Sequence, residues 1–130
     1  VITDGRVGLM APLGAALGAT AGEQTENANA IAHYVRSLSG LNADATLIAK
    51  GKQQYDKVCV ACHGVDATGN PLLGAPNLTD DIWLGSSSHQ TIVKTIMEGR
   101  TNIMPPQKHY LTPEQIDVLT AYVWGLSNNE

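Results

Sequence analysis

Two cysteines and a histidine lie together near the middle of the chain, in the order Cys59-Val60-Ala61-Cys62-His63. A spacing of three residues places both thiols on the same side of a helical turn. Thiols at this spacing can add across the two vinyl groups of a porphyrin, and the imidazole that follows can bind the iron from the proximal face. The motif therefore predicts one covalently attached c-type haem, with His63 as an iron ligand.

Three other uses of these residues fit the motif less well. A zinc ribbon needs more ligands, and the chain has no second cysteine pair. A thioredoxin-like dithiol needs a strand–helix setting that the sequence does not indicate. A disulfide between Cys59 and Cys62 would leave His63 without a role. Haem attachment is the interpretation that uses all three side chains.

A haem iron in an electron carrier usually takes a second strong axial ligand, and Met104 is the best candidate. It lies in Asn102-Ile103-Met104-Pro105-Pro106, where two prolines restrict the backbone and help to keep a weak thioether on the iron. His109 is a competing ligand close by. Met97 is expected to be a core or surface residue of a short helix. The other histidines, His33 and His89, are expected to be ordinary core or surface residues.

The start of the chain resembles part of its own end. Ile2-Thr3-Asp4-Gly5-Arg6, followed by Met10 and Pro12, echoes Ile96-Met97-Glu98-Gly99-Arg100, followed by Met104 and Pro106, at an offset of 94 residues. The segment 34–39 echoes 122–127 at an offset of 88. We interpret residues 1–40 as the last part of one module, without a haem attachment site, and residues 41–130 as a complete second module. Met10 is then a landmark without a haem of its own.

The pattern of apolar residues is helical throughout, which predicts an all-α fold. Expected helices cover 23–38, a stretch that begins after Asp44 and ends at the cysteine motif, about 89–98, and 113 to about 126. Thr112-Pro113-Glu114-Gln115 is a strong helix start. The last helix is expected to bury Ile116, Leu119 and Val123. Residues 64–88 should form a long loop, which is unusual unless it wraps something.

Composition limits the function classes. The chain has 130 residues, enough for one ordinary core, and 43% of them are hydrophobic. Its formal net charge of −4 argues against a nucleic-acid partner, which would require a basic surface. No uninterrupted apolar run is long enough to span a membrane. The first residues also lack the basic region of a signal peptide.

Residues 41–130, with their cysteine motif and a Met-Pro pair before the last helix, resemble a class I cytochrome c domain, in which short helices and loops wrap one covalent haem. The segment 74–84 (Gly-Ala-Pro-Asn-Leu-Thr-Asp-Asp-Ile-Trp-Leu), with Gly99-Arg100 and Met104-Pro105, resembles the dihaem subunit (subunit III) of cbb-type cytochrome c oxidases. That subunit has two tandem cytochrome c domains after a membrane anchor. Most of a first domain and the anchor are absent from this chain, which we therefore interpret as a fragment.

The resemblance implies further roles. The backbone carbonyl of Pro76 should accept a hydrogen bond from the His63 ring and so orient it. Leu78 should be a wall of the haem pocket, with Leu73 and Leu72 as plausible apolar neighbours. Trp83 and Arg100 are candidates to approach the haem propionates, with a structural tryptophan and a solvated arginine as the alternatives. Tyr55 and Tyr122 are expected to pack the first and last helices of the module together.

The expected function is outer-sphere electron transfer without substrate activation, because two axial ligands leave no open iron position. The resemblance implies a relay from a soluble cytochrome to the core subunits of the oxidase. A free soluble shuttle and a gas-binding haem sensor are the alternatives, and residues 1–40 could instead form an assembly surface. Covalent haem attachment occurs outside the cytoplasm, which implies the periplasmic side of the cytoplasmic membrane.

Overall fold

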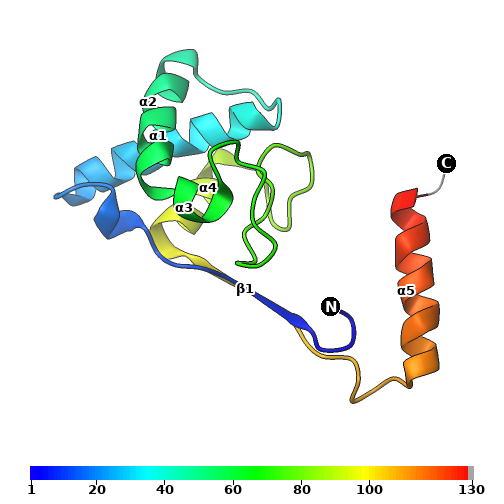
Figure 1. The fold of residues 1–130 in the computed structure, drawn as a ribbon. Helices are drawn as coiled ribbons and strands as arrows, with labels where there is room; N and C mark the ends of the chain where they lie inside the picture. The colour runs from blue at the N-terminus through cyan, green and yellow to red at the C-terminus, as the bar shows by residue number, and fades with distance from the viewer. Residues whose placement is uncertain (129–130) are drawn as a thin grey trace. The chain divides into compact units, whose positions relative to one another are not determined.

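The computed structural model describes residues 1–128 and is mostly helical (Figure 1). The elements, in chain order, are β1 (Arg6–Met10), the 3-10 helix η1 (Gly14–Ala16), α1 (Ala21–Leu38), α2 (Ala45–Val58), α3 (Val60–His63), α4 (His89–Glu98), β2 (Arg100–Met104) and α5 (Pro113–Asn128). The expected class of short helices joined by loops is confirmed. The long loop over residues 64–88 is also present, with a single isolated bridge between Asn70 and Ala75.

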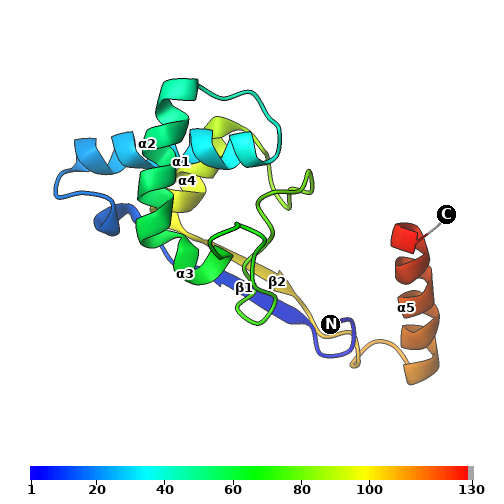
Figure 2. The same ribbon diagram turned by 45° about the horizontal axis from the view of Figure 1, so that its top comes forward.

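The sequence did not predict the small sheet in which β1 and β2 are hydrogen-bonded neighbours. Most residues of both strands are exposed. A strand without a buried face has no need to alternate apolar and polar side chains, so the usual signal of a half-buried strand is missing. The ribbon shows the two strands running in opposite directions (Figure 2).

Local capping signals explain where the helices begin. The side chain of Asp44 accepts hydrogen bonds from the backbone N–H groups of Thr46 and Leu47 at the start of α2. Ser88 accepts from the Thr91 N–H at the start of α4. These side chains satisfy donors that have no partner within the helix. The helix starts expected after Asp44 and near residue 89 are therefore confirmed.

The described residues form two compact units, one of residues 9–101 and one of residues 1–8 with 102–128. In the first unit α1 lies across α2 and also packs against α4 (Figures 1 and 2). Its core is a single cluster of buried residues, listed here with their helices or loops: Leu17, Ala28, Ile31, Ala32 and Val35 from η1 and α1, Tyr55 and Cys59 from α2 and its end, Ala67 from the loop, and Ile92 and Ile96 from α4.

The crossing of α1 and α2 is unusually close because a glycine lies at its centre. A Cβ atom added at Gly51 would lie 2.0 Å from the carbonyl oxygen of Ala30 and 2.8 Å from the Cβ of Tyr34. Beside this contact the rings of Tyr34 and Tyr55 meet edge to face, with centroids 5.3 Å apart. The aromatic partner of Tyr55 in this unit is thus Tyr34 on α1. Tyr122 belongs to the other unit and is 64% exposed, so its expected packing with Tyr55 stays a prediction.

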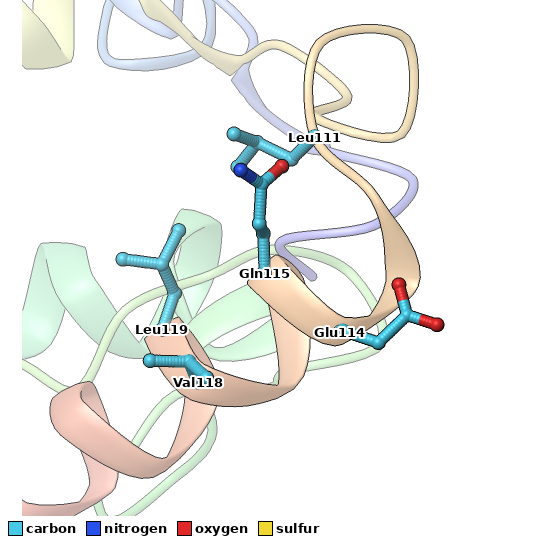
Figure 3. A pocket seen from close by; sticks show the side chains of 5 residues that line it. All are labelled: Leu111, Glu114, Gln115, Val118 and Leu119. Carbon is cyan, nitrogen blue, oxygen red and sulfur yellow. The ribbon is translucent and has the colours of Figure 1, made fainter.

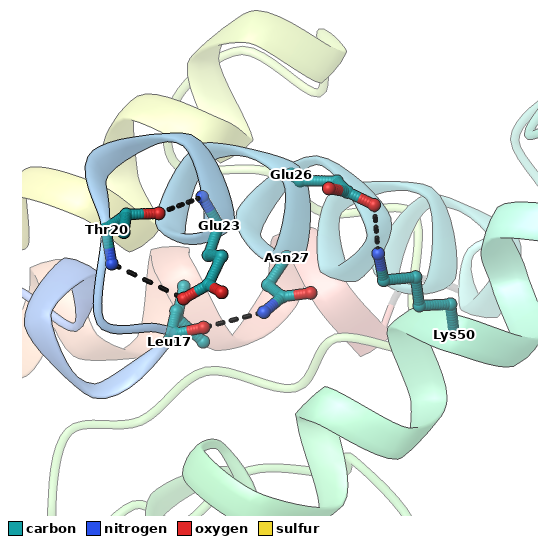
Figure 4. A network of polar contacts seen from close by, with 6 residues as sticks. All are labelled: Leu17, Thr20, Glu23, Glu26, Asn27 and Lys50. Atoms are coloured by element: carbon teal, nitrogen blue, oxygen red, sulfur yellow. Dashed lines mark hydrogen bonds and ion pairs between the residues drawn. The ribbon is translucent and has the colours of Figure 1, made fainter.

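Polar contacts fix the start of α1 and join it to α2 (Figure 4). Thr20 and Glu23 form a reciprocal capping box, in which each side chain accepts from the backbone N–H of the other residue. The Asn27 amide donates to the Leu17 carbonyl at 2.6 Å. Lys50 on α2 forms an ion pair with Glu26 on α1. The helix that contacts α2 is thus held at its beginning and along its length.

The second unit contains α5. Thr112 and Gln115 form a capping box like that of α1, as the sequence predicted. Ile116 is buried, but Leu119 and Val123 are 40% and 51% exposed, so their predicted burial is wrong. The rest of this unit consists of strand ends and loops, which offer α5 too little apolar surface to cover its face.

We expect Gly51→Ala to destabilise the fold by about 1–3 kcal/mol, because its new methyl group would overlap the backbone of α1. Gly22→Ala, near the start of α1, is the matched control, since a Cβ there meets nothing closer than 4.0 Å. The control should be neutral or stabilise by up to about 1 kcal/mol. Denaturant unfolding of both variants checks this. Equal stability of the two would contradict the close crossing.

Acidification should weaken the contact between α1 and the start of α2. Burial and the nearby His89 ring, at a centroid distance of 4.5 Å, lower the pKa of His33 below its usual 6.5. The unfolded chain then binds the proton more readily, so this part of the stability is present above pH 6.5 and is lost as the pH falls. Protonated His33 also cannot accept the Asp44 N–H. Unfolding curves at pH 5 and 7.5 should show a smaller acid loss for His33→Asn than for the wild type. His109→Asn should retain the full loss.

Candidate functional site

The cysteine motif begins at the C-terminal end of helix α2. Cys59 ends α2 and begins α3, and its backbone N–H donates to the Tyr55 carbonyl at 2.9 Å. The Tyr55 hydroxyl, on the buried face of α2, donates to the carbonyl of Gly64 at 2.8 Å. Gly64 has a φ of 84°, a conformation that favours glycine, and it ends α3 directly after His63. One buried tyrosine therefore connects α2 to the far end of the motif.

The two thiols differ in environment. Both are free, with Cys59 buried and Cys62 exposed. Burial, and to a smaller extent the neighbouring Cys62, raise the pKa of the Cys59 thiol to about 12. Cys59 is therefore a protonated thiol near neutral pH. Addition to a vinyl group consumes such an S–H group, with sulfur bonding to one carbon and hydrogen to the other.

His63 is oriented by the long loop. Its Nδ1 lies 3.1 Å from the carbonyl oxygen of Pro76, and with the proton on Nδ1 the ring donates to that oxygen. This is the hydrogen bond that the resemblance implied. The ring is 7% exposed, and burial lowers its pKa although the Pro76 contact opposes the shift. A neutral ring with Nδ1 engaged leaves Nε2 as the nitrogen that can bind a metal.

This donor set fits a haem better than a bare metal ion. Among residues 1–128, no group of three or more histidine, cysteine or acidic side chains could hold a metal ion. A haem brings four nitrogen ligands of its own and needs from the protein two unlinked thiols and an axial imidazole. Cys59, Cys62 and His63 supply these groups within one short helix and its N-cap.

The other expected pocket residues differ in their placement. Leu78 and Trp83 pack against the core of residues 9–101, and the Leu78 N–H donates to the Ala67 carbonyl at 2.8 Å. The Arg100 guanidinium lies above Gly85, where an added Cβ would be 2.6 Å from a guanidinium nitrogen. Leu73 is 52% exposed. All four residues belong to the same unit as His63.

Met104 lies at the end of β2 and is 39% exposed. It belongs to the unit that contains α5, whereas His63 belongs to the unit of residues 9–101. Its ligation of a haem iron stays a prediction.

Two structural residues of this unit were missed from the sequence. Ala67 is fully buried with a φ of 59°, a conformation that costs a non-glycine residue about 1–2 kcal/mol. No sequence signal marks it, because alanine rarely adopts this backbone. Arg36 donates from α1 to the carbonyls of Asn42 and Ser87 and so ties two loops to that helix. Its place within the echoed segment 34–39 was the available hint.

A hollow lies at the start of α5. It measures about 440 Å³ and is lined by Leu111, Glu114, Gln115, Val118 and Leu119 on the first turns of α5 (Figure 3). It contains none of the thiols or the imidazole. Within residues 1–128, no helix is both long and apolar enough to cross a membrane.

The short helices, the long loop and the Cys59–His63 motif define a c-type cytochrome domain, and the fold agrees with class I cytochrome c. Residues 46–123 match the family described as cytochrome c oxidase, cbb3-type, subunit III. The chain belongs to this family, and membership implies covalent haem c.

Curated relatives agree with the family match. A cbb3-type cytochrome c oxidase subunit CcoP of Rubrivivax gelatinosus is 46% identical over 126 residues, which cover 97% of this chain and 40% of that protein. A subunit FixP of Bradyrhizobium sp. is 45% identical over 101 residues, 77% of this chain and 35% of the relative. A CcoP of Cereibacter sphaeroides is 40% identical over 100 residues, 77% of this chain and 34% of the relative. The chain thus spans about 34–40% of the length of these proteins.

The two thiols should react at very different rates in protein prepared without haem. A shift of the Cys59 pKa from its usual 9.0 to about 12 lowers the thiolate fraction about a thousandfold, and the thiolate is the species that reacts. In Cys59→Ser the exposed Cys62 should be alkylated rapidly by iodoacetamide. In Cys62→Ser the remaining thiol should react only after denaturation. Mass spectrometry over time measures both rates, and similar rates would contradict the burial of Cys59.

Proposed function

We propose that this chain carries electrons through one covalently bound haem c, attached at Cys59 and Cys62. His63 is the proximal ligand and Met104 the sixth ligand of the complete module. The observation that carries the proposal is the donor set of two unlinked thiols beside an imidazole whose Nδ1 faces the Pro76 carbonyl. The bound haem supplies a one-electron Fe(III)/Fe(II) couple.

The chain's own residues prepare this site. The Tyr55 hydroxyl, through Gly64, keeps the end of the motif beside α2, and the Pro76 carbonyl sets the plane of the imidazole. A carbonyl that accepts the Nδ1 proton increases electron donation from Nε2, which is one way in which a protein adjusts a haem potential. Burial of His63 and Cys59 excludes water from that side of the site.

We further propose the place of this electron transfer. The relatives are named as subunits of cbb3-type cytochrome c oxidases. The chain would accept an electron from a soluble cytochrome and pass it to the core subunits of such an oxidase, on the periplasmic side of the cytoplasmic membrane. The roles of Leu78, Leu73, Trp83 and Arg100 around the haem belong to the same proposal. Leu78 and Trp83 support a pocket wall, since both pack against the core that contains Cys59.

Spectroscopy of the haem-loaded protein tests the proposed ligation. The oxidised form should show the weak far-red band of a ferric iron–methionine sulfur bond, and the reduced form should not bind carbon monoxide. The Cys59→Ala, Cys62→Ala double variant should lose haem into acidic organic solvent, whereas the wild type retains it. A wild type without the far-red band that binds carbon monoxide would instead favour a gas-binding haem protein.

The relay needs a separate measurement. The reduced holoprotein should be oxidised by a purified cbb3-type oxidase core that lacks its own subunit III, and oxygen consumption should follow. His63→Ala is the matched control, because it removes the proximal ligand and leaves the surface unchanged. A reduced wild type that the core fails to oxidise would leave the free soluble shuttle as the better assignment.

A further inference from the structure

Two equivalent backbone hydrogen bonds join the echoed segments. In one bond the first segment supplies the donor, and in the other bond the second segment does. The Leu13 N–H donates to the Ile96 carbonyl at 2.9 Å, and the Gln107 N–H donates to the Ile2 carbonyl at 3.0 Å. Leu13 and Gln107 are 94 residues apart, as are Ile2 and Ile96. The second bond is therefore the first with the two copies exchanged.

Two glycines repeat this relation. A Cβ at Gly99 would lie 2.4 Å from the Met10 carbonyl oxygen, and one at Gly5 would lie 2.3 Å from the Met104 carbonyl oxygen. Each glycine has a φ above 70°, and each is followed by an arginine. The strand ends at Met10 and Met104 thus have equivalent surroundings, and the carbonyl of each methionine lies against the glycine of the other echoed segment.

The helices that follow these strands also share features. Both begin with a capping box, from Thr20 in α1 and from Thr112 in α5, although these threonines are 92 residues apart, so α1 begins about one turn earlier than α5 at the offset of 88. At the offset of 88, the buried α1 residues correspond to apolar α5 residues at all but one position. The pairs are Ala28 and Ile116, Ala30 and Val118, Ile31 and Leu119, Ala32 and Thr120, and Val35 and Val123.

The two faces differ in burial within their own units. The α1 set is buried against α2 and α4, whereas Val118 is 70% exposed on α5. Tyr34 packs on Tyr55, whereas its counterpart Tyr122 is 64% exposed. The close contact at Gly51 is therefore made by the helix of the first copy, although the helix of the second copy is apolar at four of the five equivalent positions.

Met10, which precedes α1 in the chain, lies in the same unit as the cysteine motif. Met10 belongs to residues 9–101, with Cys59 and His63, and its partly buried side chain packs against their core. Met97 is engaged elsewhere, since its side chain lies against Gly14, with Cε 3.1 Å from an added Cβ. Of the three methionines, Met10 is the one that lies at the end of a strand in the unit of His63.

We propose that residues 9–38 occupy in this fold the place of residues 103–126 of the second module, and that the Met10 thioether is a sixth ligand of the haem iron held by His63. Met104 is the ligand when α5 packs against α2 at Gly51, and Met10 is the ligand when α1 does. The inference rests on the proposed function and adds to it an alternative sixth ligand of the iron.

Methionine-to-leucine variants of the haem-loaded full chain test the proposal. Leucine removes the sulfur and nearly conserves the volume, so the fold should be retained. The ferric far-red band should persist in Met104→Leu, because Met10 replaces the lost ligand, and it should vanish in the Met10→Leu, Met104→Leu double variant. Met97→Leu is the matched control and should keep the band.

The outcomes separate this inference from the proposed function. Loss of the band in Met104→Leu alone would overturn the role of Met10 and leave the proposed function intact. A band that survives the double variant would overturn the inference and assign the sulfur ligand to Met97. A band that is absent from the wild type would overturn methionine ligation altogether.

A second measurement identifies the ligand directly. In reduced protein labelled with carbon-13 at the methionine methyl groups, the porphyrin ring current shifts the ligand methyl strongly upfield. In Met104→Leu that upfield signal should remain, and it should be lost when Met10→Leu is added. An upfield signal that is absent from Met104→Leu would contradict the role of Met10.

Discussion

The close approach of two helices at Gly51 is the contact on which the rest of this fold depends. Because no side chain separates α2 from the Ala30 carbonyl, the helices meet backbone to backbone, and the rings of Tyr34 and Tyr55 pack beside them. The buried Tyr55 in turn donates its hydroxyl proton to the Gly64 carbonyl, at the end of the cysteine motif. The position of the thiols and of the imidazole therefore follows from a contact between helices, on the other side of α2.

The site combines this rigid support with a loop that adapts to it. The loop of residues 64–88 has little regular structure, but the Pro76 carbonyl reaches the His63 ring and the Leu78 N–H reaches the Ala67 carbonyl. Ala67 adopts its strained backbone in the fully buried core. Strain of this kind persists only where the surroundings determine the conformation, which suits a loop that has to keep one imidazole in one orientation.

Local features of this protein could be predicted from the sequence, and long-range ones could not. The N-caps at Asp44, Ser88 and Thr112, and the helices that follow them, depend on residues within one turn. The hydrogen bond to Pro76 came from resemblance to a family. The helix that packs against α2 could not be predicted. Both α1 and α5 have apolar residues at corresponding positions, and periodicity cannot say which of the two helices contacts α2. The same ambiguity concerns Met10 and Met104, and it hid the two-stranded sheet, whose exposed strands have no alternating pattern.

A helix crossing that relies on a glycine and a backbone carbonyl has a consequence for proteins built by gene duplication. Such a contact depends more on the backbone of the partner helix than on its side chains. It therefore distinguishes poorly between the corresponding helices of two repeats. Nascent tandem domains with this crossing can assemble with the wrong neighbour, a common error of repeat proteins. Differences between the copies then protect folding. The two echoed segments of this chain differ by six residues between their landmarks, and loop length changes the entropic cost of bringing a helix to its partner.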